Sequence, residues 1–373
     1  MPAEAGTAST MSPTVNHDST VLPENNLDLL RAVAVLCVFV DHVTIAVHLS
    51  TAFTQWMGQA GVQAFFVHTS LVLMSSLERD GAPIRRGWVS RFYVRRTFRI
   101  YPLAWAVITV VILLQIPRGL ATSWVPVTLG RGLSNYLLVQ NLFGTWPVLA
   151  PLWTLPLELQ MYAVLPFCFL VARLSSRKWM AVMIVTGIAM DVFFVWNQTT
   201  PRIPFMWRLS VMEFVPCFLM GVLSYWTLRR RRGARSPIAA GVWPLIIAVN
   251  LVVWSFGWLP GWHFLDRIFF CGVLGIAIPL VRDAAPSRFT RIAHQIAVYS
   301  YGIYLIHLLA IRVAFVVLEG RPVPVQVVVL IAVLTVSCFL AYHVIEKPGI
   351  ALGQRLLRGR KGDVSLGKAA PVP

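Results

Sequence analysis

Long apolar stretches alternate with short polar segments over most of this 373-residue chain. A helix of about 20 apolar residues crosses the hydrocarbon core of a bilayer, where backbone polar groups must be satisfied within the helix. Ten stretches are long enough to do so. The pattern therefore predicts an all-α integral membrane protein with about ten transmembrane helices, at 27–48, 58–77, 101–117, 157–172, 179–196, 209–227, 237–256, 263–281, 296–317 and 323–345.

The positions of the basic residues predict how these helices are oriented. Alternate polar segments, beginning with the one after the second span, contain 24 of the 32 Lys and Arg residues, whereas the remaining segments contain five. Basic residues are enriched in the cytoplasmic loops of membrane proteins. We therefore expect both the N- and C-termini in the cytoplasm, in a multi-pass protein of the inner or plasma membrane. The same clustering argues against nucleic-acid binding as the reason for the net charge of +17.

Composition and local sequence complete the expected organisation. The chain is 57% hydrophobic, and its five cysteines fall inside apolar stretches without paired spacing, which indicates neither disulfides nor a metal site. Residues 1–26 are rich in Ser, Thr, Pro and Asn and are expected to be a disordered cytoplasmic tail. Residues 27–348 are expected to form one membrane domain, and 349–373 a basic cytoplasmic tail. Residues 131–143 are too short to span, so we expect a re-entrant or interfacial segment there.

The first span carries the ionisable residues Arg31, Asp41 and His42 within its apolar run. Arg31 and His42 are eleven residues apart, which is almost three turns, so they share one helix face about 16 Å apart along the axis. Ionisable groups at membrane depth are costly, and they mark functional sites by default. A buried histidine that only binds a neighbouring helix is the alternative for His42. Asp41 adjoins His42 and points about 100° away from it.

The polar segment 78–100 is expected to be a cytoplasmic loop with an unusual charge content. It contains seven arginines and no lysine, including Arg95, Arg96 and Arg99 immediately before the next span. Seven arginines are more than a signal for the orientation of the helices requires. The simpler explanation is nevertheless that they are such a signal and also contact anionic lipid. Arginine forks bind phosphate in a bidentate manner. A phosphorylated molecule bound here could extend an arm of pantetheine length past Arg31 towards His42, a geometry that fits coenzyme A.

Several motifs, in order along residues 27–348, resemble those of the membrane-bound acyltransferase 3 family. The family includes O-acetyltransferases of bacterial surface polysaccharides and acyltransferases of macrolide antibiotics. Each motif is weakly specific alone, but their common order makes the resemblance strong. They are Arg31 with His42 after ten residues, Gly61-Val-Gln-Ala-Phe65-Phe66-Val67, Arg95-Arg96-Thr-Phe-Arg99-Ile-Tyr-Pro102, Trp153-Thr-Leu-Pro-Leu-Glu158-Leu-Gln160-Met-Tyr162, Ser300-Tyr301-Gly-Ile-Tyr304-Leu-Ile-His307 and Glu346-Lys-Pro348.

The resemblance implies a transferase that moves an acyl group from acyl-CoA, with acetyl-CoA favoured, to a hydroxyl group. Such a reaction needs a base and stabilisation of an oxyanion. His42 is the expected base or transient acyl carrier, and the sequence leaves both routes open. Glu158, from another helix, is favoured over Asp41 for orienting the imidazole, although a carboxylate in the first helical turn also has a structural explanation.

The remaining candidates concern the two substrates. Arg31, Arg95, Arg96 and Arg99 are expected to bind the donor, and no permanently bound cofactor or metal is expected. Trp153, His68, His307 and Tyr304 are expected to contact substrate. His68-Thr69-Ser70 departs from the Leu-Ser-Gly of the family pattern, which puts the acceptor in doubt.

The expected acceptor is a glycan or a glycosylated molecule. The long outer segment 118–156 supplies aromatic rings and amides that suit a sugar, although an interfacial aromatic belt would also explain the rings. Two alternatives remain open: an acceptor that is a cytoplasmic secondary metabolite such as a macrolide, and a non-enzymatic transporter or lipid sensor in which the same buried charges gate a pathway. The oligomeric state is not predicted.

Overall fold

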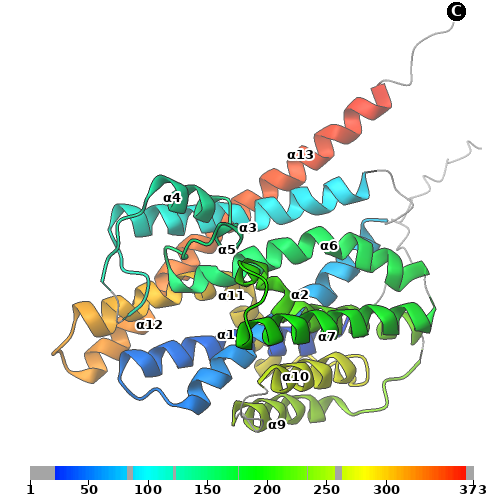
Figure 1. Ribbon diagram of the computed structural model, residues 1–373, viewed down its shortest axis with the longest axis horizontal. Helices are drawn as coiled ribbons and strands as arrows, with labels where there is room; N and C mark the ends of the chain where they lie inside the picture. The colour runs from blue at the N-terminus through cyan, green and yellow to red at the C-terminus, as the bar shows by residue number, and fades with distance from the viewer. Residues whose placement is uncertain are drawn as a thin grey trace, which may run out of the picture.

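The computed structural model describes residues 22–81, 87–120, 123–174, 176–232, 234–256 and 263–366, except the side chains at 263 and 359–366. These residues are helical apart from their connections and one isolated bridge between Ile238 and Val281. The longest helices run side by side in one bundle, and most of them lie lengthwise across Figure 1. The all-α membrane class predicted from the apolar pattern is confirmed.

The helices fall into long spans and short connecting pieces. The α-helices are α1 Glu24–Ala46, α2 Ala52–Arg79, α3 Trp88–Leu113, α4 Leu129–Tyr136, α5 Gln140–Phe143, α6 Thr154–Leu174, α7 Arg177–Thr199, α8 Val211–Arg230, α9 Trp243–Ser255, α10 His263–Ala277, α11 Arg288–Arg312, α12 Val323–Leu340 and α13 Lys347–Leu366. Short 3₁₀ turns are η1 Ala150–Trp153, η2 Met206–Leu209 and η3 Ala240–Val242, and π-helical turns are η4 Val313–Val317 and η5 Ala341–Glu346.

Eight helical segments of the described chain are long and apolar enough to cross a membrane. They include α1, α2, α3 and α7, together with η1–α6, η2–α8, α11–η4 and α12–α13. The other two predicted spans, 237–256 and 263–281, correspond to α9 and α10. These helices have 13 and 15 residues, which is about 20 and 22 Å at 1.5 Å per residue and less than the hydrocarbon thickness. They are therefore shorter than expected.

Helix α2 lies at the centre of the bundle. In its most apolar stretch of 18 residues 83% are buried, against 11% in the most apolar stretch of the same length within the α12–α13 segment. It packs against α1, α8, α9, α10 and α6. Its contact with α1 is close at Gly61, where a Cβ would lie 2.5 Å from the carbonyl oxygen of Ala34. Any larger residue at 61 would push apart the two helices that enclose the site described below.

The expectation that residues 78–100 form a loop is wrong for its second half. Helix α3 begins at Trp88, thirteen residues before the predicted span, and carries Arg91, Arg95, Arg96 and Arg99. The arginines remain helical because other elements supply partners: Arg95 pairs with Asp80, and Arg99 Nη1 lies 2.8 Å from Glu346 Oε2. Arg85 and Arg86 lie outside the described residues.

Part of the expected basic tail also belongs to the folded body. Helix α13 continues from α12 through the π-helical turn η5, whose last residue is Glu346. It packs against α3 and projects beyond the rest of the bundle (Figure 1). The first twelve residues of α13, which have described side chains, therefore form a wall of the protein and not a free tail.

A buried ion network joins α7, α8 and α10. Arg267 Nη2 donates to Asp191 Oδ1 at 2.6 Å, and Nη1 donates to Glu213 Oε1 at 2.8 Å. The Asp191 side chain is 0% exposed and that of Arg267 is 8% exposed. Because an unpaired charge inside a membrane protein is costly, these contacts fix the short helix α10 against its longer neighbours.

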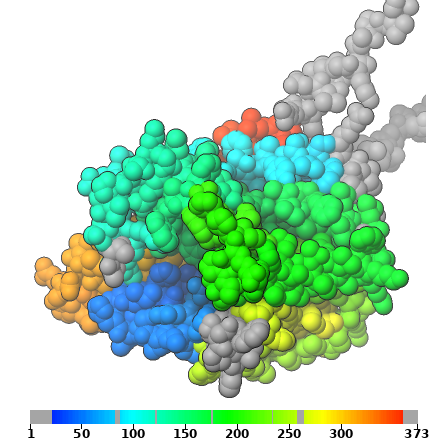
Figure 2. All heavy atoms as spheres, in the orientation of Figure 1, coloured from blue at the N-terminus to red at the C-terminus, as the bar shows by residue number. Residues whose placement is uncertain are grey.

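The segment between α3 and α6 forms the short pieces expected for residues 131–143. Helix α4 packs on α3, and α5 packs on η2. The Arg131 guanidinium donates to the carbonyl oxygens of Trp146, Pro147 and Val125 at 3.3–3.4 Å, which holds the segment in shape. In Figure 2 it forms the teal layer at one end of the molecule.

Candidate active site

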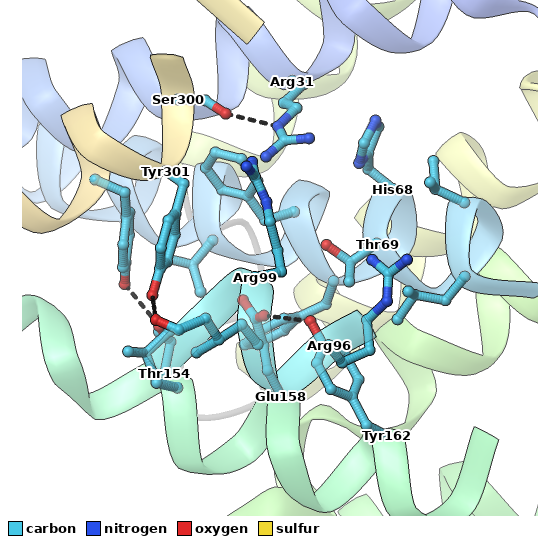
Figure 3. Close-up of a pocket in the computed structure, with 18 residues that line it drawn as sticks. Arg31, His68, Thr69, Arg96, Arg99, Thr154, Glu158, Tyr162, Ser300 and Tyr301 are labelled. Atoms are coloured by element: carbon cyan, nitrogen blue, oxygen red, sulfur yellow. Dashed lines mark hydrogen bonds between the residues drawn. The ribbon is translucent and has the colours of Figure 1, made fainter. Parts of the chain in front are cut away.

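Helix α1 positions Arg31 and His42 on the face that the eleven-residue spacing predicts. Arg31 Nε donates to Ser300 Oγ on α11 at 2.6 Å. Its guanidinium lines a central cavity of about 110 Å³ between α1, α2, α3, α6 and α11. Figure 3 shows Arg31 and Arg99 pointing into this cavity from opposite sides. Two guanidinium groups from different helices thus face one narrow space.

The central cavity is rich in polar groups for its depth. Besides Arg31 it is lined by Arg96, Arg99, Glu158 and His68. Glu158 Oε2 accepts a hydrogen bond from the Tyr162 hydroxyl at 2.8 Å, one turn along α6 (Figure 3). Three cationic side chains surround one carboxylate, so the cavity suits a polar or anionic group.

A second, smaller cavity contains His42. It has about 60 Å³ and is lined by Asp41, Gln59, Trp153 and Tyr304, among others. Tyr304 and Val62 border both this cavity and the central one. The Tyr304 hydroxyl lies 2.9 Å from Thr154 Oγ1, which fixes the ring between the two spaces. The structure therefore brings Trp153 and Tyr304 to His42, and it places His68 in the central cavity instead.

The hydrogen bonds of His42 define its neutral form. His42 Nδ1 lies 2.9 Å from the carbonyl oxygen of Val38. Because a carbonyl oxygen can only accept, the neutral ring has its proton on Nδ1 and its lone pair on Nε2. His307 is similar, since its Nδ1 lies 3.0 and 2.8 Å from the carbonyl oxygens of Ile303 and Tyr304. An Nε2 lone pair is the form that accepts a proton from a hydroxyl group.

The two imidazoles are neighbours. The ring centroids of His42 and His307 are 4.9 Å apart and their planes meet at 75°. His307 is 1% exposed, and its Nε2 has no hydrogen-bond partner among the described residues. His307 is expected from its motif to contact substrate, and the structure places its ring against that of His42.

The expectation that Glu158, and not Asp41, would orient His42 is not met by the geometry. Glu158 lines the central cavity and bonds Tyr162, whereas Asp41 lines the His42 cavity. Asp41 Oδ2 lies 3.9 Å from His42 Nδ1, too far for a hydrogen bond. Asp41 is therefore an electrostatic neighbour of the imidazole, and the Val38 carbonyl oxygen orients it.

A third cavity, of about 630 Å³, opens beside the central one. It is bordered by Arg79 from α2, by four arginines of α3, and by α13. Arg96 and Arg99 line both cavities. The three spaces thus form a series in which each shares residues with the next. We call the third space the basic cavity, and its residues are Ser76, Arg79, Asp80, Arg91, Arg95, Arg96, Arg99, Ile350, Gln354, Leu357 and Arg358.

Three parts of this site are not predicted by the sequence patterns. Ser300 belongs to a motif, but its hydrogen bond to Arg31 is not expected, and Arg79 is one of the seven arginines of 78–100 without an assigned role. The contribution of α13 was not expected. The spacing of Gly349 and Gly353 was a usable signal, because small residues four apart let helices approach closely.

Comparisons with known proteins identify the family of the chain. A model of the acyltransferase domain of the acyltransferase 3 family matches residues 24–343. YrhL of Bacillus subtilis (strain 168), named as a candidate peptidoglycan O-acetyltransferase, is 27% identical over 361 residues, which cover 86% of this chain and 54% of YrhL. Nodulation protein 10 of Rhizobium leguminosarum bv. viciae is 26% identical over 329 residues, covering 81% of this chain and 86% of that protein.

This chain spans about half the length of YrhL. No solved structure gives a significant match. The family model nevertheless covers every helix from α1 to α12, and its match includes Arg31 and His42. The protein therefore belongs to the acyltransferase 3 family of membrane-bound acyltransferases, and it is a multi-pass protein of the inner membrane.

Proposed function

We propose that the protein transfers an acyl group, acetyl in the favoured case, from acyl-CoA to a hydroxyl group of a glycan or glycosylated acceptor. The observation that carries this proposal is the series of three cavities, which leads from the basic cavity through the central cavity to the cavity that contains His42. The basic cavity offers guanidinium groups for the phosphates of the donor. The narrow central cavity suits a slender arm, and the thioester then reaches His42.

The chemistry follows from the geometry of the neutral imidazole. His42 Nε2 removes the proton from the acceptor hydroxyl as its oxygen attacks the thioester carbonyl carbon. The carbon–sulfur bond then breaks, the thiolate takes up the proton, and the products are the ester and free coenzyme A. Tyr304 borders both cavities, so its hydroxyl is our candidate to donate to the developing oxyanion. Asp41 stabilises the imidazolium through space.

A glycan acceptor is supported by the surroundings of His42 and by one relative. Trp153 and the Gln59 amide line the His42 cavity, and a flat aromatic ring beside an amide suits a sugar. YrhL is named for O-acetylation of peptidoglycan. The donor enters from the side of the arginines, which the distribution of basic residues assigns to the cytoplasm. The acceptor enters from the opposite side, past η1.

Sealed vesicles of known orientation test this assignment of sides. With the cytoplasmic face outward, radiolabelled acetyl-CoA added outside should label a glycan acceptor enclosed inside. With the opposite orientation, the same addition should give no product, because the donor cannot reach the arginines. Product formed when both substrates are present on the cytoplasmic face alone would contradict the proposal and favour an intracellular metabolite as acceptor. Uptake without a covalent product would favour a transporter.

Replacing Arg96 by lysine is expected to raise KM for acetyl-CoA about tenfold with little change in kcat. The charge is kept, but the fork that pairs with a phosphate is lost. Arg96 is the informative position because Arg95 and Arg99 are committed to Asp80 and Glu346, whereas the Arg96 hydrogen bond in the described chain is to Ser76 Oγ at 3.5 Å. Steady-state kinetics measure the effect.

The matched control is Arg177→Lys, an exposed residue at the start of α7 that lines none of the three cavities. It should leave KM unchanged. Equal kinetics for Arg96→Lys and the wild type would reduce the arginines of α3 to an orientation signal.

A further inference from the structure

One wall of the basic cavity lies outside the region that the family model matches. That match ends at residue 343, and α13 begins at Lys347. Ile350, Gln354, Leu357 and Arg358 of α13 line the cavity. Successive residues of this set are four, three and one positions apart in the sequence, so they share one face of the helix. This wall of the cavity is therefore formed by residues beyond the matched domain.

The position of α13 is determined by close packing on α3. A Cβ at Gly349 would lie 3.0 Å from the carbonyl oxygen of Phe98 and from Pro102 Cγ. At Gly353 it would lie 2.8 Å from Phe98 Cβ. The absence of side chains at these two positions lets the helix backbones meet. Glu346, the last residue of η5, binds Arg99 and so joins the residue before α13 to α3.

The charged side chains on the two walls are mostly cationic. Five arginines line the cavity from α2 and α3, and α13 adds Arg358 on the other side. Among the described residues that line the cavity, the one carboxylate is that of Asp80, and it is paired with Arg95. The described side chains of α13, at 347–358, include no acidic residue. Guanidinium groups on facing walls repel one another unless an anion lies between them.

The size of the space indicates what kind of anion fits. Its volume of about 630 Å³ lies within the roughly 300–1,000 Å³ typical of cofactor sites. The adjoining central cavity has about 110 Å³ and admits only a narrow chain. A ligand with a bulky, multiply phosphorylated end and a slender arm matches the two volumes in this order.

We propose that α13 completes the donor site, with Arg358 and Gln354 binding the phosphorylated nucleotide end of coenzyme A. This inference rests on the proposed function, because it takes coenzyme A as the donor. Arg358 supplies a fork to a phosphate, and the Gln354 amide one turn earlier adds a neutral hydrogen bond. The other source of the same chemistry is the phosphate of an anionic lipid, since Leu352 and Leu356 are 50% and 51% exposed and would rest on a membrane surface.

The helix provides its own control residue. Arg355 has the same charge, lies on the same helix and is exposed, but it does not line the cavity. Arg358→Glu and Arg355→Glu therefore change the net charge equally, and only the first places a carboxylate in the cavity. Comparing the thermal unfolding of the two variants in detergent verifies that both remain folded, and Arg358→Lys retains the charge without the fork.

The experiment measures binding of coenzyme A and of 4′-phosphopantetheine, which lacks the nucleotide, to the full-length protein in lipid-free detergent. For coenzyme A, Arg358→Glu should weaken Kd about tenfold, a moderate loss because the side chain is partly solvated. The Kd of Arg358→Lys should lie between those of the wild type and Arg358→Glu, and the Kd of Arg355→Glu should equal that of the wild type. For 4′-phosphopantetheine, all variants should bind alike.

Each other outcome has a defined meaning. If the wild type binds coenzyme A but Arg358→Glu binds it equally well, α13 is not part of the donor site, and the proposed function stands. If the wild type does not bind coenzyme A, the proposed function itself fails. A third measurement compares the wild type and Arg358→Glu in nanodiscs with and without phosphatidylglycerol. If the variant loses the response to this lipid that the wild type shows, while its affinity for coenzyme A is unchanged, the wall binds a lipid headgroup. That result would overturn the inference.

Discussion

Replacing His42 by alanine is expected to lower kcat for acyl transfer by about 10²–10⁴-fold, the range that a positioned general base contributes. The effect should fall on kcat, because donor binding depends on arginines in the other two cavities. His42 is 23% exposed in its side chain, so its removal leaves no large buried void, and the protein should insert and fold normally. Steady-state kinetics on purified protein measure the loss.

The matched control for this prediction is His343→Ala. His343 is another histidine of the membrane domain, but it is exposed and lines none of the three cavities. Its removal should leave kcat unchanged. Full activity in His42→Ala would remove the mechanism altogether. Incubation with labelled acetyl-CoA without acceptor separates the two routes, because labelled protein that is lost in His42→Ala indicates an acyl carrier.

Replacing Arg267 by alanine is expected to lower the free energy of unfolding by about 3–5 kcal/mol, the cost of breaking a buried ion pair by removing one partner. The change leaves Asp191, which is fully buried, without the guanidinium that lies 2.6 Å from it. Helix α10 has only 15 residues and depends on this contact with α7 and α8. Equilibrium or thermal unfolding in detergent measures the change.

Two further variants separate charge from packing at this site. Arg321→Ala removes an exposed arginine and should change stability little, since exposed charges contribute about 0–1 kcal/mol. The double variant Asp191→Leu with Arg267→Met should recover much of the loss, because apolar pairs of similar volume replace buried ion pairs well. Equal stability of Arg267→Ala and Arg321→Ala would show that the network does not hold α10.

The amino-acid sequence alone determined the class of the protein and the helix face that Arg31 and His42 share. Apolar stretches of bilayer length predict helices, and eight of the ten expected spans are confirmed at that length. The eleven-residue spacing of Arg31 and His42 is a property of one helix, so periodicity suffices to put both side chains on one face. Trp153 and Tyr304, quoted from motifs far apart in the chain, do meet at the His42 cavity.

Only the tertiary structure decided which groups meet across helices. Arg95 and Arg99 of α3 are paired with the carboxylates of Asp80 and Glu346, and Glu346 is 247 residues from Arg99. A window of local hydropathy treats these arginines as a loop, since it cannot include a distant partner. The same reason explains why Glu158 lines the central cavity and not the His42 cavity, and why α13 borders the basic cavity. Burial of a charge depends on its partners, and those partners come together only when the whole bundle is packed.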